Sequence, residues 1–117
     1  MPAPKPGRPA RGSTTGRPIM ALLDLLGRRW ALRVLWELRD ETLSFRSLQA
    51  RCDAMSPTVL NQRLGELREA GVVELLSEGG FRLTAEGRKL LGALTPIDNW
   101  AERWAKREGA ARSRRAQ

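Results

Sequence analysis

Uncharged polar side chains that can pair with the edges of bases are concentrated between Ser56 and Gly71. Asn61 and Gln62 carry amides that can form paired hydrogen bonds with adenine, and Thr58 can contact a thymine methyl group. These residue types predict a surface that reads base pairs. An ordinary solvated helix face has a similar composition, so this segment alone favours neither interpretation.

The same segment has the start and stop signals of a helix. Ser56 can accept a hydrogen bond from a free backbone amide of the first turn, and Pro57 suits the first helical position. Gly71 is suited to ending the helix. Leucines recur within it at helical spacing: Leu60, Leu64 and Leu67. They should face a core and turn the polar residues outward.

Helical periodicity predicts three more helices ahead of this segment, over residues 19–26, 30–38 and 45–52. Residues 53–55 join the third of them directly to the helix that starts at Ser56. A connection of this length is typical of a helix-turn-helix, in which two helices cross at a steep angle.

Three arginines near this unit are candidates for contacts with DNA phosphates. Arg28 and Arg29 lie in the turn between the first two helices, and Arg46 lies at the start of the third. A solvated turn explains Arg28 and Arg29 equally well.

The residues that follow Gly71 predict a β-hairpin. Residues 72–76 are mostly β-branched or apolar, residues 77–80 are turn-forming, and residues 81–83 alternate between apolar and polar. Arg82 should point away from the apolar face, where it can reach a phosphate or a minor groove.

The C-terminal part of the chain predicts further helix. Thr84 is placed to cap a helix, Pro96 interrupts or kinks the pattern, and a last helix ends near Gly109. One stripe of that last helix is apolar: Ile97, Trp100, Ala101 and Trp104. The stripe is larger than the edge of so small a domain needs, so we favour a dimer interface over a helix that folds back on its own domain.

The chain of 117 residues has room for one domain, and its charge is unevenly distributed. The formal net charge is +8, of which residues 18–108 contribute only +1. Residues 1–17 and 109–117 are basic and contain no acidic residue. We therefore expect a disordered basic arm over 1–17, a folded domain over 18–108 and a disordered basic tail over 109–117.

Composition also excludes several classes of function. The chain contains no histidine and one cysteine, Cys52, so a single chain cannot assemble a multi-ligand zinc site or a Cys/His nucleophilic pair. We expect no catalytic residue, metal or cofactor, and we favour a buried structural Cys52 over a redox-sensing one. No apolar run approaches the roughly 20 residues that cross a bilayer, which predicts a soluble cytoplasmic protein without a membrane partner.

The order of these elements resembles that of the HxlR-type bacterial transcriptional regulators, relatives of the MarR group. The matching stretches lie at residues 18–27, 30–38, 43–48, 56–67, 71–73 and 83–88, and at Leu94, Pro96, Asp98 and Trp100. Many members carry a cysteine directly before the Pro-Ile pair, where this chain has Arg17. Thiol sensing by that route is therefore excluded.

The resemblance implies a mainly α winged helix-turn-helix with a small β-hairpin wing, whose N- and C-terminal helices form a dimer interface. It implies a nucleoid-associated homodimer on a near-palindromic operator in double-stranded DNA. The helix over 56–70 would lie in the major groove with the hairpin over 72–83 beside it. The groove-facing candidates are Ser56, Thr58, Asn61, Gln62 and Arg63.

Two other functions fit the sequence. The near-neutral domain is compatible with a winged-helix module that binds another protein, because fold alone does not fix function. The basic ends are compatible with nonspecific nucleic-acid binding that needs no reading helix. No polar constellation marks a pocket for a small-molecule effector.

Overall fold

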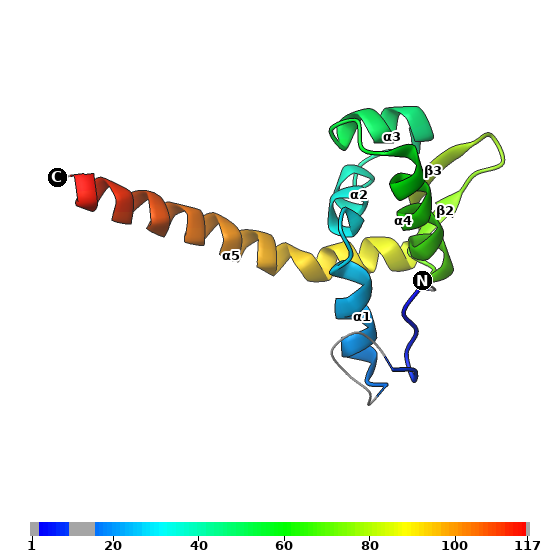
Figure 1. Cartoon of the computed structure of the whole chain (residues 1–117), viewed down its shortest axis with the longest axis horizontal. Helices are drawn as coiled ribbons and strands as arrows, with labels where there is room; N and C mark the ends of the chain where they lie inside the picture. The colour runs from blue at the N-terminus through cyan, green and yellow to red at the C-terminus, as the bar shows by residue number, and fades with distance from the viewer. Residues whose placement is uncertain (1–2, 10–15, 117) are drawn as a thin grey trace.

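The computed structural model describes residues 3–9 and 16–116, and within them it contains five helices and a small sheet. The elements are α1 (Pro18–Leu26), α2 (Ala31–Glu37), β1 (Leu43–Ser44), α3 (Phe45–Arg51), α4 (Pro57–Glu69), β2 (Val73–Leu75), β3 (Gly80–Leu83) and α5 (Ala85–Ala116). Helices α2, α3 and α4 and the hairpin gather at one end of the molecule, and α5 projects away from them (Figure 1). This order is the winged helix-turn-helix predicted from the sequence.

The core is built on the face of α4 that the leucine spacing predicts. Leu60, Leu64 and Leu67 are all buried, and they pack with Val34 and Leu35 of α2. Leucines of α1 and α3 and apolar residues of the sheet complete the same cluster. The helical period therefore decides which side of α4 is left for other contacts.

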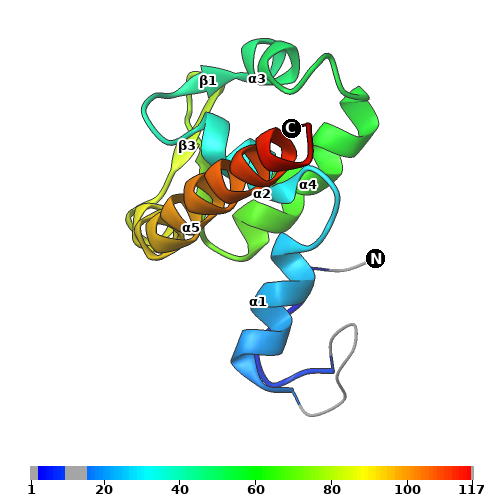
Figure 2. The ribbon, with the colours of Figure 1, turned by 90° about the vertical axis from the view of Figure 1, so that its left-hand side faces the viewer.

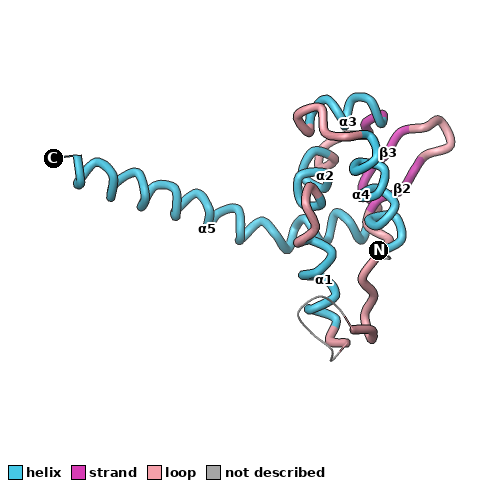
Figure 3. The backbone as a smooth tube through the Cα atoms, in the orientation of Figure 1, coloured by secondary structure: helices cyan, strands magenta, loops and turns pink. Residues whose placement is uncertain are grey.

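The sheet has three antiparallel strands in the order β1-β3-β2, one more than the predicted hairpin. Leu43 of β1 pairs with Phe81, and Val73 of β2 pairs with Leu83. Strand β1 contains two residues directly before α3, too few for an alternating pattern to be recognised. Figure 3 shows the hairpin of β2 and β3 extending beside α4.

Helix α5 is continuous through Pro96, so an interruption there and a separate last helix are wrong, while the alternative of a kink at Pro96 stays a prediction. A proline inside a helix removes one backbone hydrogen bond, which the many other bonds of a 32-residue helix outweigh. Gly109 does not end the helix either, because α5 runs on to Ala116. Figure 1 shows the C-terminal part of α5 projecting away from the other helices, and in Figure 2 the same part points toward the viewer.

Residues of the expected N-terminal arm are described in two pieces. Ala3 is buried, and the Gly7 amide donates to the Gly16 carbonyl at 2.9 Å. Residues 1–2 and 10–15 lie outside the described residues, and the disorder expected over 1–17 stays a prediction. Within the described part of the chain, no helix is both long and apolar enough to cross a membrane.

Candidate nucleic-acid interface

Helix α4 begins and ends where the sequence predicts. The Ser56 hydroxyl accepts a hydrogen bond from the Val59 amide at 3.4 Å, and Pro57 is the first helical residue. Gly71 has a φ of +81°, which a residue with a side chain adopts only under strain. The Val72 amide then donates to the Leu67 carbonyl at 3.1 Å and closes the helix end.

The turn between α3 and α4 is held by polar contacts. The amide of the Gln49 side chain donates to the Met55 carbonyl at 2.9 Å, and Arg33 donates to the Arg51 carbonyl at 2.6 Å. Asp53 and Ala54 both have positive φ, so this tight connection is strained. The contacts hold α4 at a fixed angle to α3.

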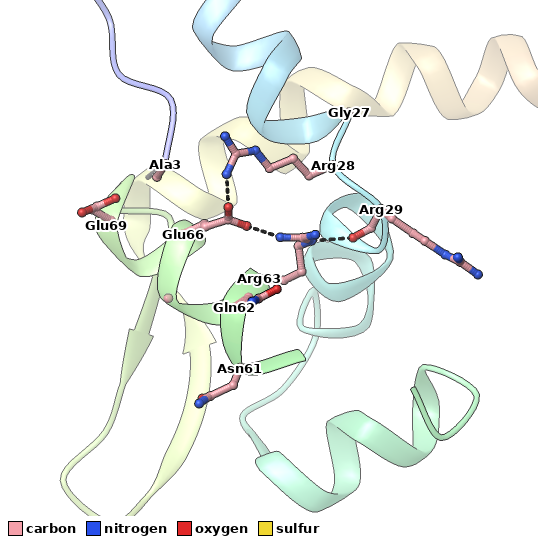
Figure 4. Close-up of a pocket in the computed structure, with 10 residues that line it drawn as sticks. Ala3, Gly27, Arg28, Arg29, Asn61, Gln62, Arg63, Glu66 and Glu69 are labelled. Atoms are coloured by element: carbon pink, nitrogen blue, oxygen red, sulfur yellow. Dashed lines mark hydrogen bonds and ion pairs between the residues drawn. The ribbon is translucent and has the colours of Figure 1, made fainter. Parts of the chain in front are cut away.

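The outward face of α4 carries the predicted polar residues. Ser56, Thr58, Asn61 and Gln62 are all exposed, as is Gly65. Figure 4 shows Asn61 extending on the side of the hairpin. Donors and acceptors of the kind that read base edges thus stand on one accessible surface.

Charge divides α4 along its length. The exposed residues of its first half are uncharged, whereas Arg68 and Glu69 are exposed in its second half. Carboxylates repel a phosphate backbone, so the first half of the helix is better suited to lie against DNA. The helix macrodipole adds partial positive charge at the same end.

Four charged side chains lie where α4 meets the end of α1 and the turn that follows it, and we call them the Glu66 cluster: Asp24, Arg28, Arg63 and Glu66. Glu66 accepts from Arg28 with one carboxylate oxygen and from Arg63, at 2.6 Å, with the other. Arg28 also lies 3.8 Å from the Asp24 carboxylate, and the Arg63 Nε donates to the Arg29 carbonyl at 2.7 Å. Dashed lines in Figure 4 mark the contacts of Glu66 and Arg63.

Two arginines predicted to contact DNA, Arg28 and Arg63, belong to this cluster. The side chain of Arg28 is 8% exposed and that of Arg63 is 17% exposed. The structure thus engages both guanidinium groups within the chain, where sequence alone suggested phosphate or groove contacts. Arg29 differs, because its side chain is exposed and its guanidinium lies 5.6 Å from the Trp30 ring centre.

The remaining predicted phosphate contacts lie on two separate elements. Arg82 points away from the buried Phe81 and Leu83, as expected, and its Nε donates to Glu74 at 2.5 Å across the hairpin. Arg46 is exposed in the first turn of α3, and it is in no ion pair with the described residues. Arg46 is therefore the freer of the two cations.

An open surface hollow adjoins the reading face of α4. It has a volume of about 760 Å³ and lies between α4 and the turn that joins α1 to α2. Arg29, Gln62 and Glu69 are among the residues that line it. The hollow is thus part of the same surface as the exposed amides.

The residues of the predicted dimer stripe are left uncovered by their own domain. Trp100 and Trp104 are each 51% exposed, and their rings stack with centres 6.0 Å apart. Ile97 is exposed and Ala101 is half-buried on the same helix. Ile19 and Leu23 of α1 add exposed apolar surface.

Cys52 is fully buried at the end of α3, and burial raises the pKa of its thiol. A raised pKa lowers the fraction of thiolate, the form that reacts. Its surroundings therefore suit the structural role expected from the sequence. Among the described residues no group of acidic residues and cysteine is arranged to hold a metal ion.

Two ion pairs of the Glu66 cluster have local signals in the sequence. Asp24 and Arg28 are four residues apart, and Arg63 and Glu66 are three apart, which are spacings at which helical neighbours form ion pairs. Arg28 and Glu66 are 38 positions apart in the sequence, so no local spacing predicts their contact. Arg68 was also missed as an exposed cation on α4.

Comparison with known proteins agrees with this architecture. A family model described as HxlR-like helix-turn-helix matches residues 25–109. The HTH-type transcriptional regulator YvaP of Bacillus subtilis is 32% identical over 88 residues, which cover 70% of this chain and 82% of YvaP.

Solved structures are similar as well. The quinone-bound form of YodB from B. subtilis has a TM-score of 0.68 and 26% identity, over 73% of this chain and 96% of that one. The transcriptional repressor BigR from Xylella fastidiosa has a TM-score of 0.59 and 30% identity, over 68% of this chain and 81% of that one.

Proposed function

The chain belongs to the HxlR-like helix-turn-helix family of DNA-binding transcriptional regulators, and we therefore propose that it binds a near-palindromic operator as a homodimer. In this proposal α4 enters the major groove and the hairpin of β2 and β3 lies beside it. The family is one of regulators and is not an enzyme family.

The observation that carries this proposal is the division of α4 into two faces. Its leucines are buried in the core, while Thr58, Asn61 and Gln62 are exposed together. Asparagine and glutamine amides match the donor and acceptor pattern of adenine in the major groove. An ordinary solvated helix face has a similar composition, and it is the family membership that favours base reading here.

Phosphate contacts would frame the reading helix. Arg29, Arg46 and Arg82 are exposed and lie on the turn before α2, on α3 and on the hairpin. We omit Arg28 and Arg63 from this set because Glu66 already holds both. Phosphate contacts orient a protein on the duplex, so these arginines would position α4 over its bases.

The exposed apolar residues of α1 and α5 support the dimer. A contiguous apolar patch on a helix that leaves its own domain marks a surface for association. Trp100 and Trp104 would supply its aromatic centre. In a symmetric dimer the two α4 helices would sit about one DNA turn apart, roughly 34–36 Å.

Selection of bound DNA from a random library by the full-length protein tests the proposal. We expect a near-palindromic motif whose halves are about 10 base pairs apart, centre to centre. Recovery of DNA without a shared motif would contradict sequence-specific binding, and a motif without symmetry would contradict the dimer.

The variant Gln62→Ala tests the role of α4 within the same assay. If Gln62 reads a base, discrimination at one position of each half-site should fall by about 1–3 kcal/mol. Affinity for random DNA should stay unchanged, which serves as the internal control. An unaltered motif would remove Gln62 from the reading surface.

A further inference from the structure

The charged groups of the Glu66 cluster are bonded mainly to one another, although Arg28, Arg63 and Glu66 also line the open hollow beside the reading face. The side chains of Asp24, Arg28 and Glu66 are 7%, 8% and 11% exposed. We propose that the cluster consists of positioning residues that fix α4 relative to α1, and that it thereby sets the half-site spacing accepted by the dimer. This inference rests on the proposed function.

The contacts tie α4 to a neighbouring segment at two points. Glu66 bonds the guanidinium of Arg28, which follows the end of α1. One helical turn earlier, Arg63 donates to the backbone carbonyl of Arg29. Arg63 also bonds Glu66 at 2.6 Å, so the contact of Glu66 with Arg28 and the contact of Arg63 with the Arg29 carbonyl belong to one hydrogen-bonded network.

Such contacts add directional restraints to those that the buried leucines impose on α4. Apolar burial is proportional to area and is not directional. Hydrogen bonds weaken steeply when they bend, and a shift by one residue turns a helix by about 100° and moves it by about 1.5 Å. Any such shift of α4 would separate Glu66 and Arg63 from their partners.

Buried charges are weak contributors to stability, since removing them from water offsets their attraction. In some proteins such groups specify one arrangement among several. A cluster of two arginines and two acids whose side chains are 7–17% exposed and bonded to one another fits that use better than it fits phosphate binding.

The cluster reaches α1 through Asp24, and the neighbouring Leu23 is exposed on the same helix. If α1 contributes to the dimer interface, the position of α4 relative to α1 within each protomer sets the distance between the two α4 helices of the dimer. The spacing between half-sites is the DNA counterpart of that distance.

Two pairs of matched variants test the inference in the full-length protein. Glu66→Gln and Glu69→Gln each remove one negative charge from α4, but only Glu66 belongs to the cluster. Arg63→Gln and Arg68→Gln each remove one positive charge, and only Arg63 belongs to it. Binding is measured to a single half-site, and to palindromes with the selected spacing or one base pair more or less.

We expect wild type and the two controls to prefer the selected spacing by about tenfold or more in Kd. Glu66→Gln and Arg63→Gln should lose most of that preference while keeping their affinity for a single half-site. This combination separates a positioning role from a contact role, which would lower affinity equally at every spacing.

The inference is overturned if the cluster variants keep the wild-type spacing preference, or if Arg63→Gln weakens binding uniformly. If the wild type selects no palindrome from the DNA library, the proposed function and this inference both fail. That outcome is visible in the wild-type experiment alone and is thus distinct from a failure of the inference in the variants. Circular dichroism reports folding. Should Glu66→Gln unfold, Arg63→Gln still decides the matter, because it leaves the bond between Arg28 and Glu66 in place.

Discussion

Glu74 and Arg82 face each other across the hairpin, and their side chains form an ion pair at 2.5 Å. The one cation that the strands of the hairpin offer to DNA is therefore partly neutralised within the described structure. Because both side chains are about half exposed, the pair itself contributes little stability. The ion pair should instead weaken DNA binding, because Glu74 partly neutralises Arg82.

The variant Glu74→Gln should bind DNA more tightly, because it frees Arg82 for a phosphate. The phosphate contact of Arg82, which the ion pair weakens in the wild type, would then form in full and steepen the dependence of log K on log salt by up to about 0.9. Glu86→Gln is the matched control, since Glu86 forms an exposed ion pair with Lys89 at 3.0 Å on α5. Equal salt slopes for wild type and Glu74→Gln, measured by fluorescence anisotropy, would show that the hairpin arginine does not reach DNA.

Replacing Trp100 and Trp104 together with alanine should raise the monomer fraction in sedimentation velocity experiments. Both rings are half exposed on the protomer, so their removal should leave its core intact. Glu102→Ala, an exposed change on the same helix, serves as the control. A double variant as dimeric as the wild type would place the interface elsewhere.

A chain cut to residues 18–108 should still prefer its operator over random DNA. The removed ends carry seven of the eight net positive charges, so the affinity and the salt dependence should both fall. Competition binding against random DNA measures the preference. Loss of all preference on truncation would favour the alternative in which the basic ends bind nucleic acid without a reading helix.

The variant Gly87→Ala should destabilise the fold by about 1–3 kcal/mol, because a methyl group at this position would collide with the Val72 carbonyl. Gly92→Ala, on the same helix, has open space around the new methyl group and should stabilise by about 0.5–1 kcal/mol. Urea unfolding of both variants measures the difference. Equal stabilities would mean that the backbone at Val72 can move away from α5 at no cost.

Much of α4 was predictable because its signals are local. Ser56, Pro57 and Gly71 mark its ends, and the leucine period marks its inner face. The hairpin was predictable for the same reason. Its third strand was not, because β1 consists of Leu43 and Ser44 alone and owes its pairing to β3, far along the chain.

The candidate site was only partly predictable. Exposure of Asn61 and Gln62 follows from the helical period. The engagement of Arg28 by Glu66 depends on how α1 and α4 pack, which no spacing within one helix encodes. The continuity of α5 was missed because Pro96 is a local signal of interruption that the rest of a long helix overrides.

The length of α5 has a mechanical consequence. About 20 residues follow Pro96 in the helix, which corresponds to roughly 30 Å at 1.5 Å per residue. A change of 10° in direction at Pro96 would therefore displace the far end by about 5 Å. A small bend at Pro96 would thus become a large movement at the C-terminal end of the helix. The backbone hydrogen bond that Pro96 removes makes this point the easiest place for such a bend.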